Sequence, residues 1–265
     1  MGRTGLALGG GAVRGLAHLG VLKAFERHGI RIDRIAGTSM GGAIGGLYAA
    51  GISAGDIEQL LLRTPKYRLL DIGIRHRGLF AGNTVHHTIN ELLQSRGKHD
   101  LRIEQFPVEF RAIAVDLIRG KQVVLDEGEL GVALRATTAF PGVFAPLMAG
   151  DQMLVDGGVL NNLPVEEVLG GDIDYVIAVD VAREHENKPP RNMFEVVYRS
   201  YSLMTAERKH ASLKLADYVI RPDVGSYAAF DFTKTQECIR AGEEAAEQSM
   251  EELKHQIQIR IASKS

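Results

Sequence analysis

The sequence has little of what marks a secreted, membrane-spanning or nucleic-acid-binding protein. Cys238 is the only cysteine among its 265 residues, which excludes an internal disulfide and suits a reducing compartment. A formal net charge of −2 gives no sign of a nucleic-acid partner. The longest apolar run, from about Gly41 to Ile52, is far short of the ~20 residues that a membrane-spanning helix needs, and no basic-then-apolar leader opens the chain. We therefore expect a soluble, cytoplasmic protein without nucleic-acid partners.

Strand-like and helical patterns alternate along the chain, whose 45% of hydrophobic residues is ordinary for a globular protein with a core. A short apolar strand at 6–8 precedes a helical segment whose apolar residues recur every three or four positions and whose predicted stop is Gly29. A second strand at 32–36 completes a strand–helix–strand unit. Such a unit implies a parallel sheet with right-handed crossovers, so we predict the α/β class.

The later segments continue this pattern. Strands are predicted over about 108–115, 122–125, 153–155, 175–179 and 218–221, the first two joined as a hairpin. Helices are predicted over about 55–62, 83–94, 130–138, 193–213 and 236–261, and another is expected to open at Asn161-Asn162 with Pro164. The closing helix carries an apolar stripe, which we expect to dock on the sheet.

The stretch most suited to chemistry is Gly37-Thr38-Ser39-Met40-Gly41, between the second strand and an apolar helical segment rich in small residues. A serine between two glycines at a strand-to-helix turn fits the nucleophile elbow, G-x-S-x-G. The glycines permit a tight, strained turn that exposes the hydroxyl, and the helix N-terminus favours negative charge beside it. The alternative is a glycine-rich turn in which Ser39 only caps the helix.

A second glycine-rich turn, residues 9–15, follows the first strand. A dinucleotide-binding fingerprint fits it poorly, because its glycine register is broken and no acidic residue ends the second strand. An anion cradle fits better, since the successive N–H groups of Gly10, Gly11 and Ala12 can face one anion. Both turns follow strand ends, where open parallel sheets build their sites.

Ser39 needs a base before it can act as a nucleophile at neutral pH. The residue order of an α/β-hydrolase would select a late histidine, which leaves His185, His210 or His255. The first lies in a polar loop and the other two lie within long predicted helices. None of the three occupies a turn after a strand, so the histidines are better interpreted as solvated or packing residues.

Aspartates are better placed, because three predicted strands end in one, at Asp116, Asp156 and Asp180. Only Asp156 is followed by Gly157-Gly158, which permits a sharp turn and leaves the carboxylate free to face a site. The alternative is a turn residue that satisfies local N–H groups. A carboxylate with an unperturbed pKa near ~3.9 is a weak base, so the site would have to raise that pKa by desolvation.

Taken in order, these motifs resemble the bacterial branch of the patatin-like phospholipases. The resemblance rests on the glycine-rich stretch within 6–22, the elbow around Ser39 and the segment from Asp156 to Pro164, and it covers about residues 5–182. It implies a three-layer α/β/α fold with a mainly parallel central sheet, in a single domain over 1–265 whose C-terminal helices in 183–265 pack on the rest. It also implies a lipid ester substrate and a reaction that needs no cofactor or metal ion.

The resemblance implies a serine–aspartate dyad without histidine. Ser39 would attack an ester carbonyl to form an acyl-enzyme, and Asp156 would take the serine proton and later activate water. The N–H groups of residues 10–12 would hold the oxyanion. Ala12 stands where the family usually has a glycine, a strained choice if that position needs a positive φ. Arg14 matches the family's basic residue, with a structural and an oxyanion-supporting role both open.

The stretch 63–80 mixes five cations with apolar residues. One interpretation is a surface connection with solvated charges, and the other is a cover that makes transient contact with anionic membrane surfaces. The dyad does not dictate the acyl acceptor. An acyltransferase or general esterase, and a regulatory protein with a vestigial site, therefore stand as alternatives to a lipid acyl-hydrolase.

Overall fold

The structure is a computed structural model of the chain. It describes residues 2–63, 101–182, 189–190, 192–225 and 227–262, together with the short stretches 72–75, 78–80, 91, 93–94 and 97. Most of the predicted helix at 83–94 and much of the segment 63–80 therefore lie outside the described residues.

The order of the elements follows the alternation expected from the sequence. The strands are β1 (Arg3–Leu8), β2 (Arg34–Thr38), β3 (Ile72–Arg75), β4 (Gly78–Phe80), β5 (Glu109–Asp116), β6 (Lys121–Leu125), β7 (Leu147–Ala149), β8 (Gln152–Asp156), β9 (Ile173–Val179) and β10 (Tyr218–Ile220). The α-helices are α1 (Ala17–His28), α2 (Met40–Ala49), α3 (Ala54–Arg63), α5 (Leu130–Thr137), α6 (Met193–Met204), α7 (Ala206–Leu213) and α8 (Thr235–Ala262). Short 3₁₀ helices are η1 (Ala12–Leu16), η3 (Ile103–Gln105), η4 (Gly157–Val159) and η5 (Phe232–Lys234).

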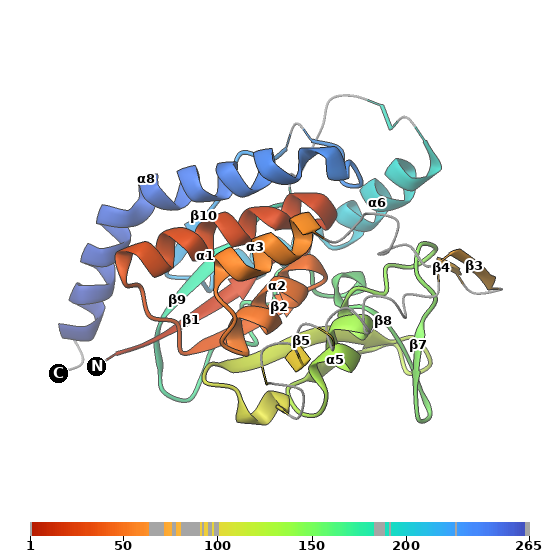
Figure 1. The fold of residues 1–265 in the computed structure, drawn as a ribbon, viewed down its shortest axis with the longest axis horizontal. Coiled ribbons are helices and arrows are strands. Elements are labelled where there is room, and N and C mark those ends of the chain that lie inside the picture. Colours follow the sequence, from red (N-terminus) through yellow and green to blue (C-terminus); the bar gives the residue numbers. More distant parts are fainter. Residues whose placement is uncertain are drawn as a thin grey trace.

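One mixed sheet organises the molecule, with the strand order β10–β9–β1–β2–β5–β8–β7 and with β6 also paired to β5 (Figure 1). The pairs from β10 to β5 are parallel, whereas β6, β8 and β7 add antiparallel pairs. The predicted hairpin of β5 and β6 is confirmed. The patterns missed the three-residue strand β7. The parallel half of the sheet is the half that carries the two glycine-rich turns.

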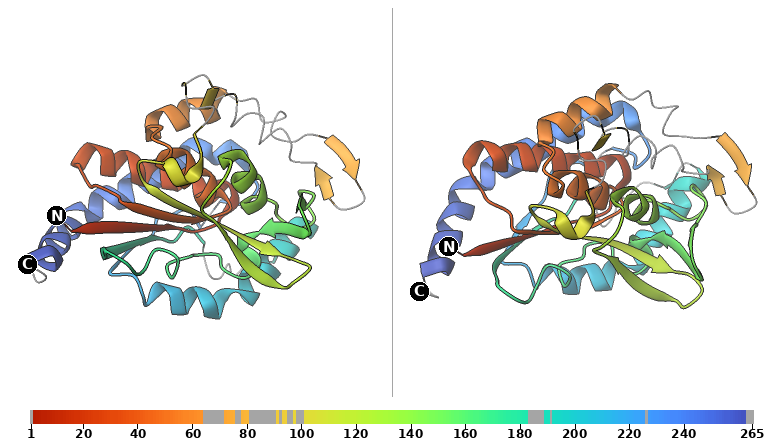
Figure 2. Two further views of the ribbon diagram at one scale, coloured as in Figure 1. Left: turned by 90° about the horizontal axis from the view of Figure 1, so that it is seen from below. Right: turned by 60° about the horizontal axis from the view of Figure 1, so that its bottom comes forward.

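Side chains alternate between the two faces of the sheet, as the period of a strand requires. Leu6 and Ile35 belong to the main core beneath the N-terminal helices, whereas their neighbours Ala7 and Ala36 face a smaller core built with Leu163 and other residues of 163–168. Figure 2 shows α1, α3 and α8 on one side of the sheet and α7 on the other. The three-layer α/β/α prediction is thereby confirmed.

The closing helix α8 packs along α1, which in turn lies on the sheet (Figure 1). Arg27 of α1 donates to Glu243 at 2.6 Å and to Glu247 at 2.5 Å. The hydroxyl of Tyr175 on β9 donates to Gln256 at 2.7 Å. The predicted docking of this helix on the sheet is right only in part, because most of its contact is with α1.

Two helix predictions are wrong. The segment 193–213 forms two helices, α6 and α7, that meet at Thr205. The Thr205 Oγ1 donates to the Tyr201 carbonyl at 3.1 Å, a bond of the kind that bends helices. No helix opens at Asn161-Asn162, because residues 160–172, all described, form turns and bends. Both asparagines instead bond to neighbouring segments.

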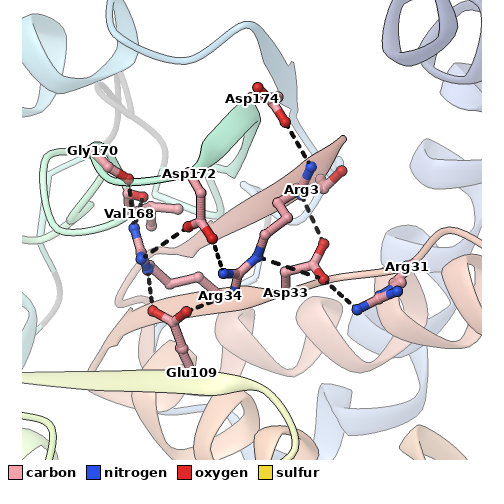
Figure 3. Close-up of polar contacts among 10 residues, drawn as sticks. Arg3, Arg31, Asp33, Arg34, Glu109, Val168, Gly170, Asp172 and Asp174 are labelled. Atoms are coloured by element: carbon pink, nitrogen blue, oxygen red, sulfur yellow. Dashed lines mark hydrogen bonds and ion pairs between the residues drawn. The ribbon is translucent and has the colours of Figure 1, made fainter. Parts of the chain in front are cut away.

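A network of arginines and carboxylates ties strands together at their amino ends, opposite the strand ends that carry the glycine-rich turns (Figure 3). Arg34, which opens β2, has a side chain only 8% exposed and donates to Glu109 on β5 at 2.7 Å. It also donates to the carbonyls of Val168 at 3.1 Å and Gly170 at 2.9 Å. Arg3 on β1 reaches the same Glu109 at 2.6 Å. This end of the sheet is therefore fixed independently of the turns.

Candidate active site

Ser39 occupies the turn between β2 and α2 with a φ of 54° and a ψ of −125°. Such a conformation is rare outside glycine and costs on the order of 1–3 kcal/mol. Thr137, at the end of α5, holds the turn, because its Oγ1 accepts the Ser39 N–H at 3.0 Å and donates to the Ile113 carbonyl at 2.5 Å. The glycines on either side allow close approach: a Cβ on Gly37 would lie 2.6 Å, and one on Gly41 2.3 Å, from a backbone carbonyl oxygen. The segment thus forms a strained strand-to-helix turn.

The strand register brings Asp156 beside Ser39. Thr38 pairs with Ile113 across β2 and β5, and the next residue of β5, Ala114, pairs with Asp156 across β5 and β8. Residues 39 and 156 therefore flank the same point of β5, although they are far apart in the sequence. This convergence follows from the sheet order, with β5 between the two strands that carry them.

The Asp156 carboxylate is buried, with 1% of the residue exposed. Its Oδ1 accepts the Gly158 N–H at 2.9 Å and the Tyr201 hydroxyl at 3.5 Å. Burial raises the pKa of Asp156 from its ordinary 3.8 to about 6, while hydrogen bonds from Ser39, Gly158 and Tyr201 oppose the rise by favouring the ionised form. The carboxylate is therefore a stronger base than an exposed aspartate, as general-base chemistry near neutral pH requires.

The glycine-rich turn after β1 lies against Ser39, since a Cβ on Gly10 would be 3.2 Å from the Ser39 Cβ. Asn162 holds Gly10 twice: its carbonyl accepts the Gly10 N–H at 2.9 Å, and its Nδ2 donates to the Gly10 carbonyl at 3.1 Å. The expectation that the Gly10 N–H faces an anion is therefore corrected, because that donor is already used. Within the described part of the chain, no acceptor is bonded to the N–H of Gly11 or Ala12.

Ala12 has a φ of 49°, which is the left-handed value that favours glycine. The alanine at this position is therefore strained, as its departure from the family pattern suggested. Arg14 is 5% exposed, and its Nε donates to the Tyr227 carbonyl at 2.7 Å. The Val13 N–H donates to the Ala229 carbonyl at 2.9 Å. The C-terminal region thus anchors the turn, and this favours the structural role for Arg14.

His18 lies on the buried face of α1, fully shielded from solvent. Its Nε2 is 2.7 Å from the Gly9 carbonyl, so this nitrogen must carry the hydrogen of that bond. Burial lowers the pKa of His18 to about 4, and the ring is neutral at physiological pH. The sequence offered a signal for its burial, since His18 lies four and seven residues before the core residues Leu22 and Phe25.

Four aromatic residues gather beside Asp156, and the sequence motifs named none of them. Phe140 is central: its ring centroid lies 5.2 Å from Tyr201, 6.1 Å from Tyr198 and 5.9 Å from Phe230. These residues come from the segment after α5, from α6 and from the segment before η5. Only the tertiary fold brings them together, so no local signal could have identified them.

The two other strand-end aspartates are engaged elsewhere. Asp116 is bonded to Arg119 at 2.7 Å and accepts the Ile118 N–H at 3.0 Å. Asp180 forms a buried ion pair with Lys209 at 3.2 Å. These carboxylates are therefore bonded to cations, whereas the Asp156 carboxylate is the one that interacts with the Ser39 hydroxyl.

Of the late histidines, His210 is exposed on α7 and His255 is exposed on α8, while His185 lies outside the described residues. The described residues contain no group of three or more histidine, cysteine, aspartate or glutamate side chains that could hold a metal ion. Among the described helices, none is both long and apolar enough to cross a membrane.

The family model described as patatin-like phospholipase matches residues 6–169, a span that contains both glycine-rich turns, Ser39 and Asp156. This chain belongs to the patatin-like phospholipase family. The resemblance carried by the motifs is thereby confirmed. The match ends before β9, so the helices α6, α7 and α8 lie beyond it.

Relatives in sequence and structure agree with this assignment. A protein of the NTE family from Mycobacterium tuberculosis is 38% identical over 182 residues, which cover 68% of this chain and 49% of the relative. Lysophospholipase NTE1 of Eremothecium gossypii is 31% identical over 90% of this chain and 17% of its own length. The chain thus spans about half the length of the mycobacterial relative. The crystal structure of VipD from Legionella pneumophila shares the fold, with a TM-score of 0.61 at 14% identity over 93% of this chain and 66% of VipD.

Proposed function

We propose that the protein is a serine acyl-hydrolase that cleaves carboxylic esters of lipids, with phospholipids or lysophospholipids as the substrate class. The observation that carries the proposal is the buried carboxylate of Asp156, which interacts with the Ser39 hydroxyl and whose pKa burial raises to about 6. Family membership supports it, as does the similarity to a protein named as a lysophospholipase.

In the acylation step, the Ser39 Oγ attacks the ester carbonyl carbon while its proton passes to the Asp156 carboxylate. The carbonyl π electrons move to the oxygen, which becomes the oxyanion of a tetrahedral intermediate. Collapse of this intermediate breaks the bond to the leaving alcohol, and the alcohol oxygen takes the proton from Asp156. The products are an acyl-serine and a free alcohol.

In the deacylation step, water is the nucleophile. Asp156 takes a proton from water as the water oxygen attacks the acyl carbon, and it returns a proton to the Ser39 Oγ when the acyl bond breaks. A fatty acid leaves and both side chains regain their starting protonation states. Because a single carboxylate serves as base and then as acid in each half, a pKa near neutrality suits both roles.

The oxyanion needs donors near Ser39, and the N–H groups of Gly11 and Ala12 are the candidates that the turn leaves available. The strained Ala12 and the anchored Val13 and Arg14 fix the backbone of the turn before substrate arrives. A donor aimed in this way is typically worth ~2.7–4 kcal/mol of transition-state stabilisation, because it costs no reorganisation during the reaction.

Labelling with a fluorophosphonate lipid analogue tests the proposal, with the adduct mapped by mass spectrometry. We expect the phosphonate on Ser39, and we expect Ser39→Ala to lose both labelling and ester hydrolysis while its melting temperature stays within a few degrees. Ser53→Ala is the matched control, because Ser53 only caps α3 through Asp56. Labelling at another residue, or hydrolysis by Ser39→Ala, would contradict the proposal.

A series of esters of increasing chain length, assayed in water and with an added alcohol, identifies the acyl acceptor. Release of fatty acid supports a hydrolase. Preferential transfer to the alcohol would indicate an acyltransferase on the same site, and labelling without turnover of any ester would indicate a regulatory protein.

A further inference from the structure

Helix α6 lies beyond the residues matched by the family model, yet it reaches the carboxylate of Asp156. The Tyr201 hydroxyl, near the end of this helix, is 3.5 Å from Asp156 Oδ1. That oxygen also accepts the Gly158 N–H, at 2.9 Å. Two donors from different segments therefore meet on one oxygen of the proposed base.

The position of Tyr201 is closely constrained. Its ring packs edge-on against Phe140, with the centroids 5.2 Å apart and the planes at 61°. Its carbonyl accepts the Thr205 N–H at 3.2 Å, where α6 ends. A Cβ on Gly158 would lie 1.9 Å from the Tyr201 hydroxyl oxygen, so the hydroxyl occupies the space that any side chain at 158 would need. The second glycine after Asp156 is thus required by a residue of α6.

We propose that Tyr201 is a positioning residue for the base, and that its hydroxyl, together with the Gly158 N–H, holds the Asp156 carboxylate turned toward Ser39. The inference rests on the proposed function, because it assigns Asp156 the role of base. Tyr201 keeps its own proton throughout the reaction and transfers none.

The hydrogen bond from Tyr201 determines the direction in which this residue shifts the pKa of Asp156. A donor to a carboxylate favours the ionised form, and the Tyr201 hydroxyl therefore lowers the pKa of Asp156 against the opposing effect of burial. Burial, with the nearby charge of Asp156, holds the pKa of Tyr201 well above its ordinary value, so the phenol stays a donor through the neutral range.

Few other groups act on this pair. Among the described residues, the groups that influence either pKa are the Ser39 hydroxyl from the elbow, the Gly158 N–H from η4 and Tyr198 from α6. Removal of the Tyr201 hydroxyl would leave the burial of Asp156 in place and take away one of its three hydrogen bonds. The pKa of Asp156 in Tyr201→Phe should therefore rise above that of the wild type.

The experiment measures kcat/KM between pH 5 and pH 9 on a short, water-soluble ester. In the wild type, activity should rise with pH through the pKa of Asp156. In Tyr201→Phe the midpoint of this rise should move to higher pH, and the plateau should fall by about three- to tenfold, the range expected for the loss of one hydrogen bond. The matched control is Tyr198→Phe, which also removes a phenol from α6 but leaves the bond to Oδ1 intact.

A second variant without a donor, Tyr201→Met, guards against a packing effect of one substitution and should shift the midpoint in the same direction. An unchanged or lowered midpoint in both variants would overturn the inference, as would an equal shift in Tyr198→Phe. If the wild type itself neither hydrolyses esters nor takes the phosphonate at Ser39, the proposed function fails instead. The two failures are therefore distinguishable.

Discussion

Substitution of Asp156 by asparagine should stabilise the protein at neutral pH while it removes the base. The folded-state pKa of Asp156 is raised by burial from 3.8 to about 6. Between these two values the folded protein holds a proton that the unfolded chain has already released. The wild type therefore loses stability as the pH rises through this window, because a buried carboxylate must ionise.

The size of the effect follows from the shift in pKa. Each unit corresponds to ~1.4 kcal/mol, so a rise from 3.8 to about 6 corresponds to ~3 kcal/mol of destabilisation at pH 7. An asparagine has no charge to bury and keeps an oxygen that can accept the Gly158 N–H. The difference in unfolding free energy, Asp156→Asn minus wild type, should rise by ~2 kcal/mol from pH 4.5 to pH 7, the remainder being present already at pH 4.5, and should stay nearly constant above pH 7.

Urea unfolding at several pH values between 4.5 and 8 measures this difference. The comparison with the wild type at each pH cancels the titration of groups that both proteins share. One such group is buried His18, whose lowered pKa makes the fold lose stability as the pH falls from about 6.5 towards 4. Asp116→Asn is the matched control, because the bond from Arg119 lowers the pKa of Asp116 and places its titration below this window. A difference for Asp156→Asn that is flat or falls with pH would refute the reasoning.

Two further predictions concern the turn and the opposite end of the sheet. Ala12→Val should reduce both stability and kcat, because a β-branched residue is poorly accommodated at a φ of 49°. Ala12→Gly should retain activity. Kinetics on a soluble ester and thermal melts of both variants test this. Arg34→Leu should destabilise the fold by ~1–3 kcal/mol, because Glu109 then keeps only its bond from Arg3 and the carbonyls of Val168 and Gly170 lose the donor that Arg34 supplies. Its kcat should be nearly unchanged, because Arg34 lies at the strand end opposite Ser39, and a large fall in kcat with the fold intact would contradict this.

The parts of the site that the sequence predicted are those in which local chemistry determines local structure. The elbow glycines flank Ser39 within five residues. The close backbone contact of Gly37 is within the turn itself, whereas Gly41 lies against the Leu8 carbonyl of β1. The pair of glycines after Asp156 could likewise be recognised from the sequence. The sequence could not show why the second of these glycines, Gly158, is needed. The Tyr201 hydroxyl, which fills the space of a side chain at 158, comes from another helix.

Prediction failed where the hydrogen bonds of individual polar side chains override the pattern of apolar residues. The spacing of apolar residues in 193–213 favours one helix, but Thr205 bonds back to the preceding turn and the chain divides into α6 and α7. Asn162 looks like part of a helix start, yet the fold uses both its carbonyl and its amide to hold Gly10. The same contact removes the Gly10 N–H from the predicted anion cradle. Such pairings require the sheet to be assembled first.

The place of β9 in the sheet has a consequence for how this chain can be divided. β9 lies between β1 and β10, yet it begins at Ile173, after the last residue that the family model recognises. A fragment cut at that boundary would expose the backbone of β1 as an unpaired edge, a surface prone to aggregation. It would also separate α8 from α1 and Tyr201 from Asp156. The stretch that is easiest to recognise is thus shorter than the stretch that must be expressed, and a recombinant fragment has to include β9, α6 and α8.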